Sequence, residues 1–118
     1  MRVNLFVVTA LLCLFTLLVP STWASPSTTA PRLLSGHASE ILTLAFSPNG
    51  TVLATGGTDQ TIRLWDPESG QDLKLLRGHM GAVHALAFSP HGKFLASGSA
   101  DTSVRMWDLA SGRELHAV

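Results

Sequence analysis

The chain carries the pentapeptide Leu44-Ala45-Phe46-Ser47-Pro48, and the same five residues return as Leu86-Ala87-Phe88-Ser89-Pro90, 42 positions further along. Other pairs keep this spacing without a gap, among them Gly36-His37 with Gly78-His79 and Trp65-Asp66 with Trp107-Asp108. A fixed period of roughly 20 to 50 residues is typical of arrays in which each repeat is one small unit packed on its neighbours. The sequence therefore predicts two copies of one structural unit.

Each unit divides into four short apolar runs separated by turn residues, and none of the runs is long enough for a helix. The expected strands are Ile41–Phe46, Val52–Thr55, Ile62–Trp65 and Leu73–Leu76, then Val83–Phe88, Phe94–Ser97, Val104–Trp107 and Leu115–Val118. Ser47-Pro48-Asn49-Gly50 suits a tight hairpin, because proline presets φ at the second position and glycine tolerates positive φ at the fourth. We therefore predict four antiparallel strands per unit, paired in sequence order.

With these residues the sequence resembles the WD-repeat family, whose repeats form the four-stranded blades of a β-propeller. The resemblance rests on the Gly-His start, the Trp-Asp end and the 42-residue spacing, and it covers about Leu33 to Val118. It implies an all-β fold of two four-stranded antiparallel blades of an incomplete propeller. The repeats would occupy residues 33–75 and 76–118.

The resemblance also implies a hydrogen-bonded set of four polar side chains within each blade. The matching residues are His37, Thr55, Asp59 and Trp65 in the first unit and His79, Ser97, Asp101 and Trp107 in the second. Their chemistry suits a chain of hydrogen bonds, since an indole N–H only donates, a hydroxyl or neutral imidazole does both, and a carboxylate only accepts.

The same residue types could be mistaken for a hydrolase triad. However, the set occurs twice, one copy uses threonine, and no Gly-x-Ser-x-Gly motif is present to expose a nucleophile. The remaining histidines, at positions 84, 91 and 116, have no partner at a fixed metal-ligand spacing. We expect a structural network, with no catalytic residue, no cofactor and no metal.

The N-terminal 24 residues have the three-part form of a secretory signal peptide. Arg2 supplies positive charge, Leu5–Val19 is an uncharged apolar run, and Ala24 offers a small residue for cleavage. Pro20 ends the run short of the roughly 20 apolar residues that a transmembrane helix needs. We expect a signal helix cleaved after Ala24, or alternatively an uncleaved anchor, followed by a Ser/Thr/Pro linker over residues 25–32. The protein would then be secreted or periplasmic, with membrane contact only through this segment.

Composition narrows the classes of partner. The 118 residues include 8 Lys plus Arg and 8 Asp plus Glu, so the formal net charge is zero and nucleic-acid binding is not expected. The length excludes a large two-domain enzyme. The single cysteine, Cys13, lies in the apolar N-terminal run, so a cleaved chain would contain no disulfide.

The family resemblance implies a non-catalytic scaffold for protein–protein interaction, in which loops at the blade ends contact partners. The candidate residues are Ser39, Glu40, Thr58, Met80 and Ala100. An alternative is an exported ligand- or carbohydrate-binding propeller formed by homo-oligomerisation, although aromatic residues for sugar stacking are scarce.

A propeller closes with roughly four to eight blades, each covered on both faces, and this sequence supplies two. If an open face exposes several hundred Å² of apolar surface, covering it is worth on the order of 10 kcal/mol at about 25 cal/mol per Å². Arg32-Leu33-Leu34 resembles the outer strand of a preceding blade, because Leu34 aligns with Leu76. Three interpretations stay open: a segment of a longer array, a homo-trimer or homo-tetramer that closes a ring, or a chain that docks on another propeller.

Overall fold

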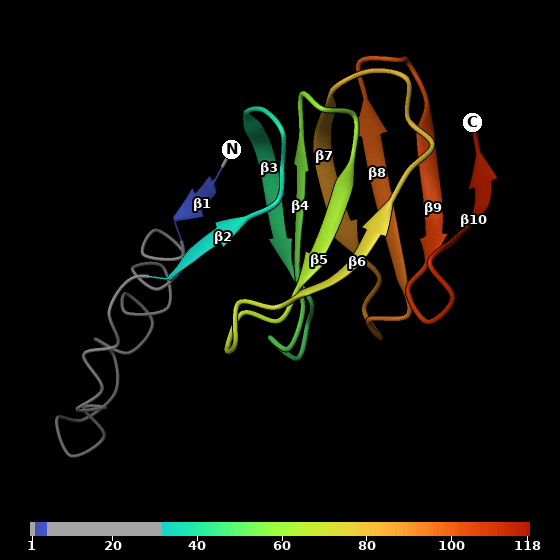
Figure 1. Ribbon diagram of the computed structural model, residues 1–118. Helices are drawn as coiled ribbons and strands as arrows, with labels where there is room; N and C mark the ends of the chain where they lie inside the picture. Colours follow the sequence, from blue (N-terminus) through green and yellow to red (C-terminus); the bar gives the residue numbers. More distant parts are fainter. Residues whose placement is uncertain (1, 5–31) are drawn as a thin grey trace, which may run out of the picture.

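The computed structural model describes residues 2–4 and 32–118, and this part of the chain contains strands and no helix. Two four-stranded antiparallel sheets make up most of it (Figure 1). The first contains β3 (Ile41–Phe46), β4 (Leu53–Gly57), β5 (Ile62–Trp65) and β6 (Asp72–Leu76). The second contains β7 (Val83–Phe88), β8 (Phe94–Ser99), β9 (Val104–Asp108) and β10 (Arg113–Ala117). Within each sheet the strands pair in sequence order, which confirms the two predicted four-stranded units.

Tight turns join β3 to β4 and β7 to β8. The Gly50 N–H donates to the Ser47 carbonyl at 2.9 Å, and Gly92 repeats this bond to Ser89 at the same distance. Both glycines have positive φ, +73° and +70°, a conformation that costs glycine little because it lacks a Cβ. The turns predicted from proline and glycine are therefore confirmed.

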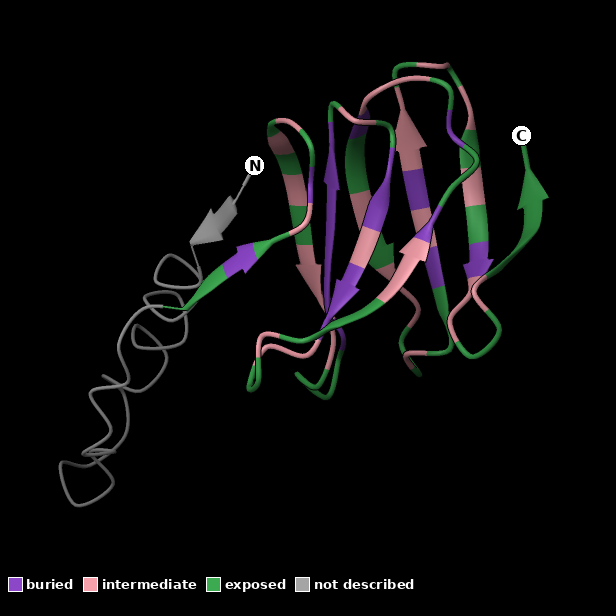
Figure 2. Cartoon of the chain, in the orientation of Figure 1, coloured by how far each residue is buried: buried purple, intermediate pink, exposed green. Residues whose placement is uncertain are grey.

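The two sheets pack on each other through an apolar core, with β7 lying against β3 and β4. Gly56 of β4 makes this approach possible, since a Cβ there would lie 2.6 Å from Cγ1 of Val83. Figure 2 shows the buried residues concentrated in β4 and β5, whereas β10 is exposed along its length. Both sheets contribute to the core, whose buried members are Ala54, Ile62, Leu64, Leu76, Val83, Leu95 and Trp107.

Five of the eight strands, β4, β6, β8, β9 and β10, differ from the prediction at one or both ends. β4 continues past Thr55 to Gly57, and β8 continues to Ser99, because the ends of both strands stay paired with the first residue of the preceding strand. A side chain at Gly57 would meet the Glu40 carbonyl at 2.4 Å, so only glycine fits this paired position. β10 begins at Arg113, which pairs with the last residue of β9.

A short strand, β2 (Leu33–Ser35), lies outside both sheets and pairs antiparallel with β1 (Arg2–Asn4). Leu34 is buried against Leu53 and Trp65 of the first sheet, which fits its predicted role as an outer strand. β1 was not predicted, because its residues fall at the start of the expected signal peptide. The residues of the expected signal helix from Leu5 onward, and nearly all of the expected linker, lie outside the described residues. Among the residues described, no helix has the length and apolar character needed to span a membrane.

Candidate functional site

Four polar side chains from separate parts of the first unit meet inside it. Trp65, at the end of β5, donates its indole N–H to the Thr55 hydroxyl of β4 at 2.8 Å. The same hydroxyl lies 2.8 Å from Nε2 of His37, in the loop before β3. Nδ1 of His37 lies 2.9 Å from Oδ2 of Asp59, in the turn between β4 and β5. The structure thus joins all four matched residues in one continuous series.

The second unit repeats this series with serine in place of threonine. Trp107 donates its indole N–H to the Ser97 hydroxyl at 2.8 Å, and that oxygen lies 2.7 Å from Nε2 of His79. Nδ1 of His79 lies 2.9 Å from Oδ2 of Asp101. A hydroxyl is therefore the group that both units require at this position.

The carboxylate of the first unit is held in its ionised form. Burial raises the pKa of the Asp59 carboxyl, but its hydrogen bonds outweigh burial and lower the pKa from 3.8 to about 2. Thr61 donates its hydroxyl to Oδ1 at 2.8 Å and its N–H at 3.1 Å, and the Ala38 N–H reaches Oδ2 at 3.0 Å. Because an ionised carboxylate only accepts, Nδ1 of His37 donates in its contact with Asp59, and Nε2 then pairs with the hydroxyl. Each link in the series then has one donor and one acceptor.

Asp101 has matching partners in the second unit. The Ser103 hydroxyl, at 2.6 Å, is the largest cause of a pKa well below the usual value, and the Met80 N–H and His79 contribute in the same direction. The hydroxyls of Thr61 and Ser103 were missed in the sequence analysis. The 42-residue spacing pairs these two residues, and that match of hydroxyl with hydroxyl was the signal that could have found them.

The order of hydroxyl, imidazole and carboxylate has the connectivity of a hydrolase triad, but the surroundings do not suit catalysis. Thr55 and Ser97 are buried, and each hydroxyl already accepts an indole N–H, so a substrate carbonyl has no access to the oxygen. Within residues 2–4 and 32–118, no three His, Cys, Asp or Glu side chains group together as metal ligands. The chemistry supported here is structural hydrogen bonding.

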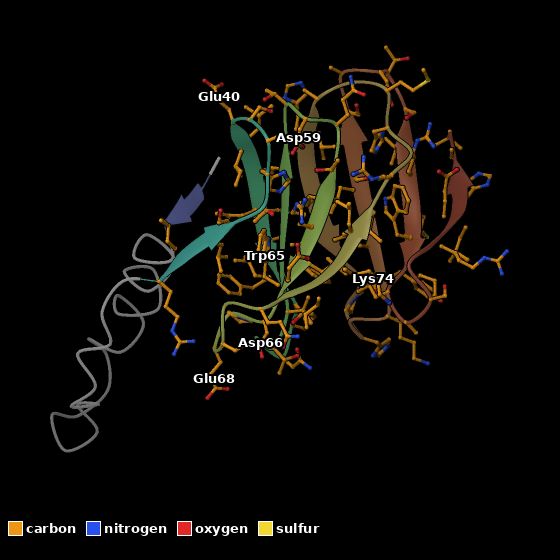
Figure 3. All side chains as sticks on the ribbon, viewed as in Figure 1. Glu40, Asp59, Trp65, Asp66, Glu68 and Lys74 are labelled. Atoms are coloured by element: carbon orange, nitrogen blue, oxygen red, sulfur yellow. The ribbon has the colours of Figure 1, made fainter. Side chains whose placement is uncertain are left out.

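The network also fixes loops at one end of the sheets. The Ala38 N–H and the Met80 N–H donate to the two network carboxylates, so the loops before β3 and β7 are anchored by their backbone. Figure 3 places Glu40 and Asp59 at this end of the first sheet, and Asp66 and Glu68 at the opposite end.

Three of the residues predicted to contact partners, Ser39, Glu40 and Met80, lie on these anchored loops, and Thr58 and Ala100 lie in the turns after β4 and β8. In the first unit, Thr58 donates its hydroxyl to Ser39 Oγ at 2.6 Å and its N–H to the Glu40 carbonyl at 2.9 Å, so these three residues are brought together. In the second unit, Met80 is largely exposed, and Ala100 donates its N–H to a carbonyl of the loop that follows Met80. The five positions therefore form two neighbouring loop clusters, one on each sheet.

Comparison with known proteins adds the following matches. The family model described as WD domain, G-beta repeat (WD40), matches residues 28–66 and 70–108. Protein Mut11 of Chlamydomonas reinhardtii is 37% identical over 54 residues, which cover 44% of this chain and 15% of Mut11. Protein pleiotropic regulator PRL2 of Arabidopsis thaliana is 38% identical over 56 residues, covering 44% of this chain and 12% of PRL2. Ribosome biogenesis protein erb1 of Botryotinia fuckeliana is 49% identical over 46 residues, covering 39% of this chain and 6% of erb1. Each match spans a small part of a much longer relative.

Proposed function

Because the chain belongs to the WD40 family of WD-repeat proteins, we propose that it acts as a non-catalytic protein-interaction module that binds its partner with the loops at one end of the two sheets. The binding surface would consist of Ser39, Glu40, Thr58, Met80 and Ala100. One observation carries this assignment: two network carboxylates anchor the backbone of these loops, so the loops are held in place before any partner arrives. Preorganised loops reduce the entropy lost on binding.

The chemistry of this end favours a partner surface with an apolar contact and few charges. Met80 offers an exposed, flexible thioether side chain, which adapts to different apolar surfaces. Glu40 is the one charged residue among the five candidates. A partner with an apolar side chain near a basic group would complement both.

The proposal is tested by charge reversal at the two ends of the first sheet. Glu40→Lys alters the loop end, and Glu68→Lys makes the same change at the opposite end, where the side chain is also exposed (Figure 3). Tagged wild type and variants would be used to capture partners from the source cells, with quantitative mass spectrometry of the bound proteins. We expect Glu40→Lys or Met80→Lys to lose a partner that Glu68→Lys retains. A partner lost equally from both ends, or from neither, contradicts the assignment.

Export is a second part of the proposal, and it rests on the N-terminal sequence alone. Arg2, the apolar run Leu5–Val19 and the small residue Ala24 have the pattern that a secretory signal requires. The mature protein would begin at Ser25 and act outside the cytosol. N-terminal sequencing of protein recovered from the culture medium or periplasm tests this directly, and an intact N-terminus on protein retained by the cells would argue against cleavage.

A further inference from the structure

One face of the first sheet is covered by the second sheet. Ile62 and Leu64 of β5 and Leu76 of β6 are 0%, 4% and 1% exposed. They share a core with Val83 of β7, the strand that packs against β3 and β4. The shared core therefore contains residues of β5 and β6 of one unit together with the first strand, β7, of the next.

The second sheet presents the same side of its own unit, and no described residue covers it. The equivalent residues, 42 positions further along, are Val104, Met106 and Val118, which are 50%, 44% and 74% exposed. Phe94 of β8 is also exposed and lies on the same side as Met106, so it extends this surface, which we call the β9 face. Single exposed apolar residues are ordinary, but a set at positions that form core in the neighbouring unit marks an interaction site.

The first sheet carries the matching half of the interface. In the second sheet, Leu86 and Phe88 of β7 pack against the core that the two sheets share. Their equivalents on β3 are Leu44 and Phe46, and Leu44 is exposed. We call these two residues of β3 the β3 face.

We propose that the β9 face of one copy of this chain binds the β3 face of a second copy, with the geometry that already joins the two sheets within one copy. One chain carries both halves of this interface, the uncovered β9 face and the β3 face beside β2, which is the requirement for head-to-tail association between identical chains. The formal net charge of zero adds no long-range repulsion between copies. This self-association uses the faces of the sheets, so it is independent of the loop surface proposed above.

One strand of the receiving copy moves when this contact forms. Leu34 of β2 packs with Leu53 and Trp65, and Leu76 shares the core of the equivalent Leu95 and Trp107 in the second sheet. Val118 is the equivalent residue of the incoming copy, so Val118 takes the place of Leu34, which leaves it. β2 is a three-residue strand outside both four-stranded sheets, so it is the element that the incoming copy displaces.

The test uses one lysine substitution on each face and a control beside them. Met106→Lys disrupts the β9 face, and Leu44→Lys disrupts the β3 face. Leu115→Lys is the control, because Leu115 lies at the irregularity in the pairing of β10 and is 53% exposed. Its equivalent, Leu73, is exposed even though the first sheet is covered, so this position lies outside the interface.

The mass of the full chain and of each variant would be followed by light scattering over a range of concentrations, with circular dichroism to verify the β-sheet signal. We expect wild type and Leu115→Lys to form a discrete oligomer, and each face variant to weaken association at least about tenfold. A folded wild-type monomer, or an oligomer that Met106→Lys leaves intact, overturns the proposal. The second result would place the contact elsewhere, including the N-terminal segment.

Mixing the two face variants tests the head-to-tail geometry itself. Met106→Lys keeps a working β3 face and Leu44→Lys keeps a working β9 face, so an equimolar mixture should form one-to-one pairs that stop at two chains. Native mass spectrometry with one variant labelled with ¹⁵N distinguishes the mixed pair from pairs of identical variants. A mixture that stays monomeric, or that forms identical pairs, overturns the head-to-tail arrangement.

Discussion

Replacing Thr55 with valine tests whether the buried hydroxyl of the first unit stabilises the fold through its hydrogen bonds. The change removes the acceptor of the Trp65 indole N–H, and a buried donor without its partner costs about 1–3 kcal/mol. It also removes the bond to Nε2 of His37, worth about 0.5–1.5 kcal/mol. Valine occupies nearly the same volume, so little is added by a cavity. We expect the free energy of unfolding to fall by about 2–4 kcal/mol, a large share of the roughly 5–15 kcal/mol of a typical domain.

The matched control is Thr55→Ser, which keeps the hydroxyl and removes one methyl group. Ser97 forms the equivalent bonds in the second sheet, so serine is known to fit the network. Loss of a buried methyl costs about 0.5–1.5 kcal/mol. Urea unfolding followed by tryptophan fluorescence gives both values, provided that the slope with denaturant is unchanged. A valine variant as stable as the serine variant, or more stable, would show that packing and not hydrogen bonding decides this position.

Three further predictions follow from the same geometry. Trp107→Ala should lower the free energy of unfolding by about 3–5 kcal/mol, because it leaves a cavity at a buried site. Replacing exposed His91 should change the free energy of unfolding by less than about 0.5 kcal/mol. An unchanged urea midpoint for the tryptophan variant would contradict the place of Trp107 in the core. The pKa of Asp59 is about 2 in the folded chain against 3.8 for an unperturbed carboxyl, so its contribution to the free energy of unfolding is fully present above about pH 4 and is lost as the pH falls toward 2. The pKa of Asp101 is lowered as well, so it acts in the same direction. Melting temperatures between pH 5 and pH 2 should therefore decline less steeply in Asp59→Asn than in wild type. Lys74→Met keeps the apolar stem but removes the ammonium that donates to two backbone carbonyls of the loop after β9, at 2.8 and 3.0 Å. It should cost about 1–2 kcal/mol in the same unfolding assay. No loss is expected if the two sheets are held by apolar contact alone.

Local pattern was sufficient to locate the strands wherever the relevant residues are neighbours in sequence. Ile41–Phe46 and Val83–Phe88 agree with the structure to the residue. The predicted strand ended at Thr55, directly before two successive glycines, a residue type that usually weakens a strand. The structure keeps Gly56 in β4, since Val83 of the other sheet takes the space of a side chain. That contact joins two different units, so no pattern within one unit could reveal it.

The candidate site, too, was predictable from the sequence only in part. The family resemblance implied the four residue types in each network, and each of them recurs at the 42-residue spacing as the same chemical group, with Thr55 matched by Ser97. Thr61 and Ser103 recur as well, but their role depends on the path of the turn that brings each hydroxyl to a carboxylate. The pairing of β1 with β2 joins strands about thirty residues apart, and the sequence carries no pattern that specifies it.

The gapless 42-residue register allows the chain to be treated as a one-dimensional lattice. In such a lattice the folding free energy is approximately the sum of an intrinsic energy for each site and a coupling energy for each pair of neighbours. Leu76 of the first unit supplies the contact to the second, so duplicating residues 35–76 directly after Leu76 would add one site and one coupling of the same kind. The stability of such length variants would separate the two energies, and a coupling larger than the intrinsic energy would make folding propagate from unit to unit as a zipper.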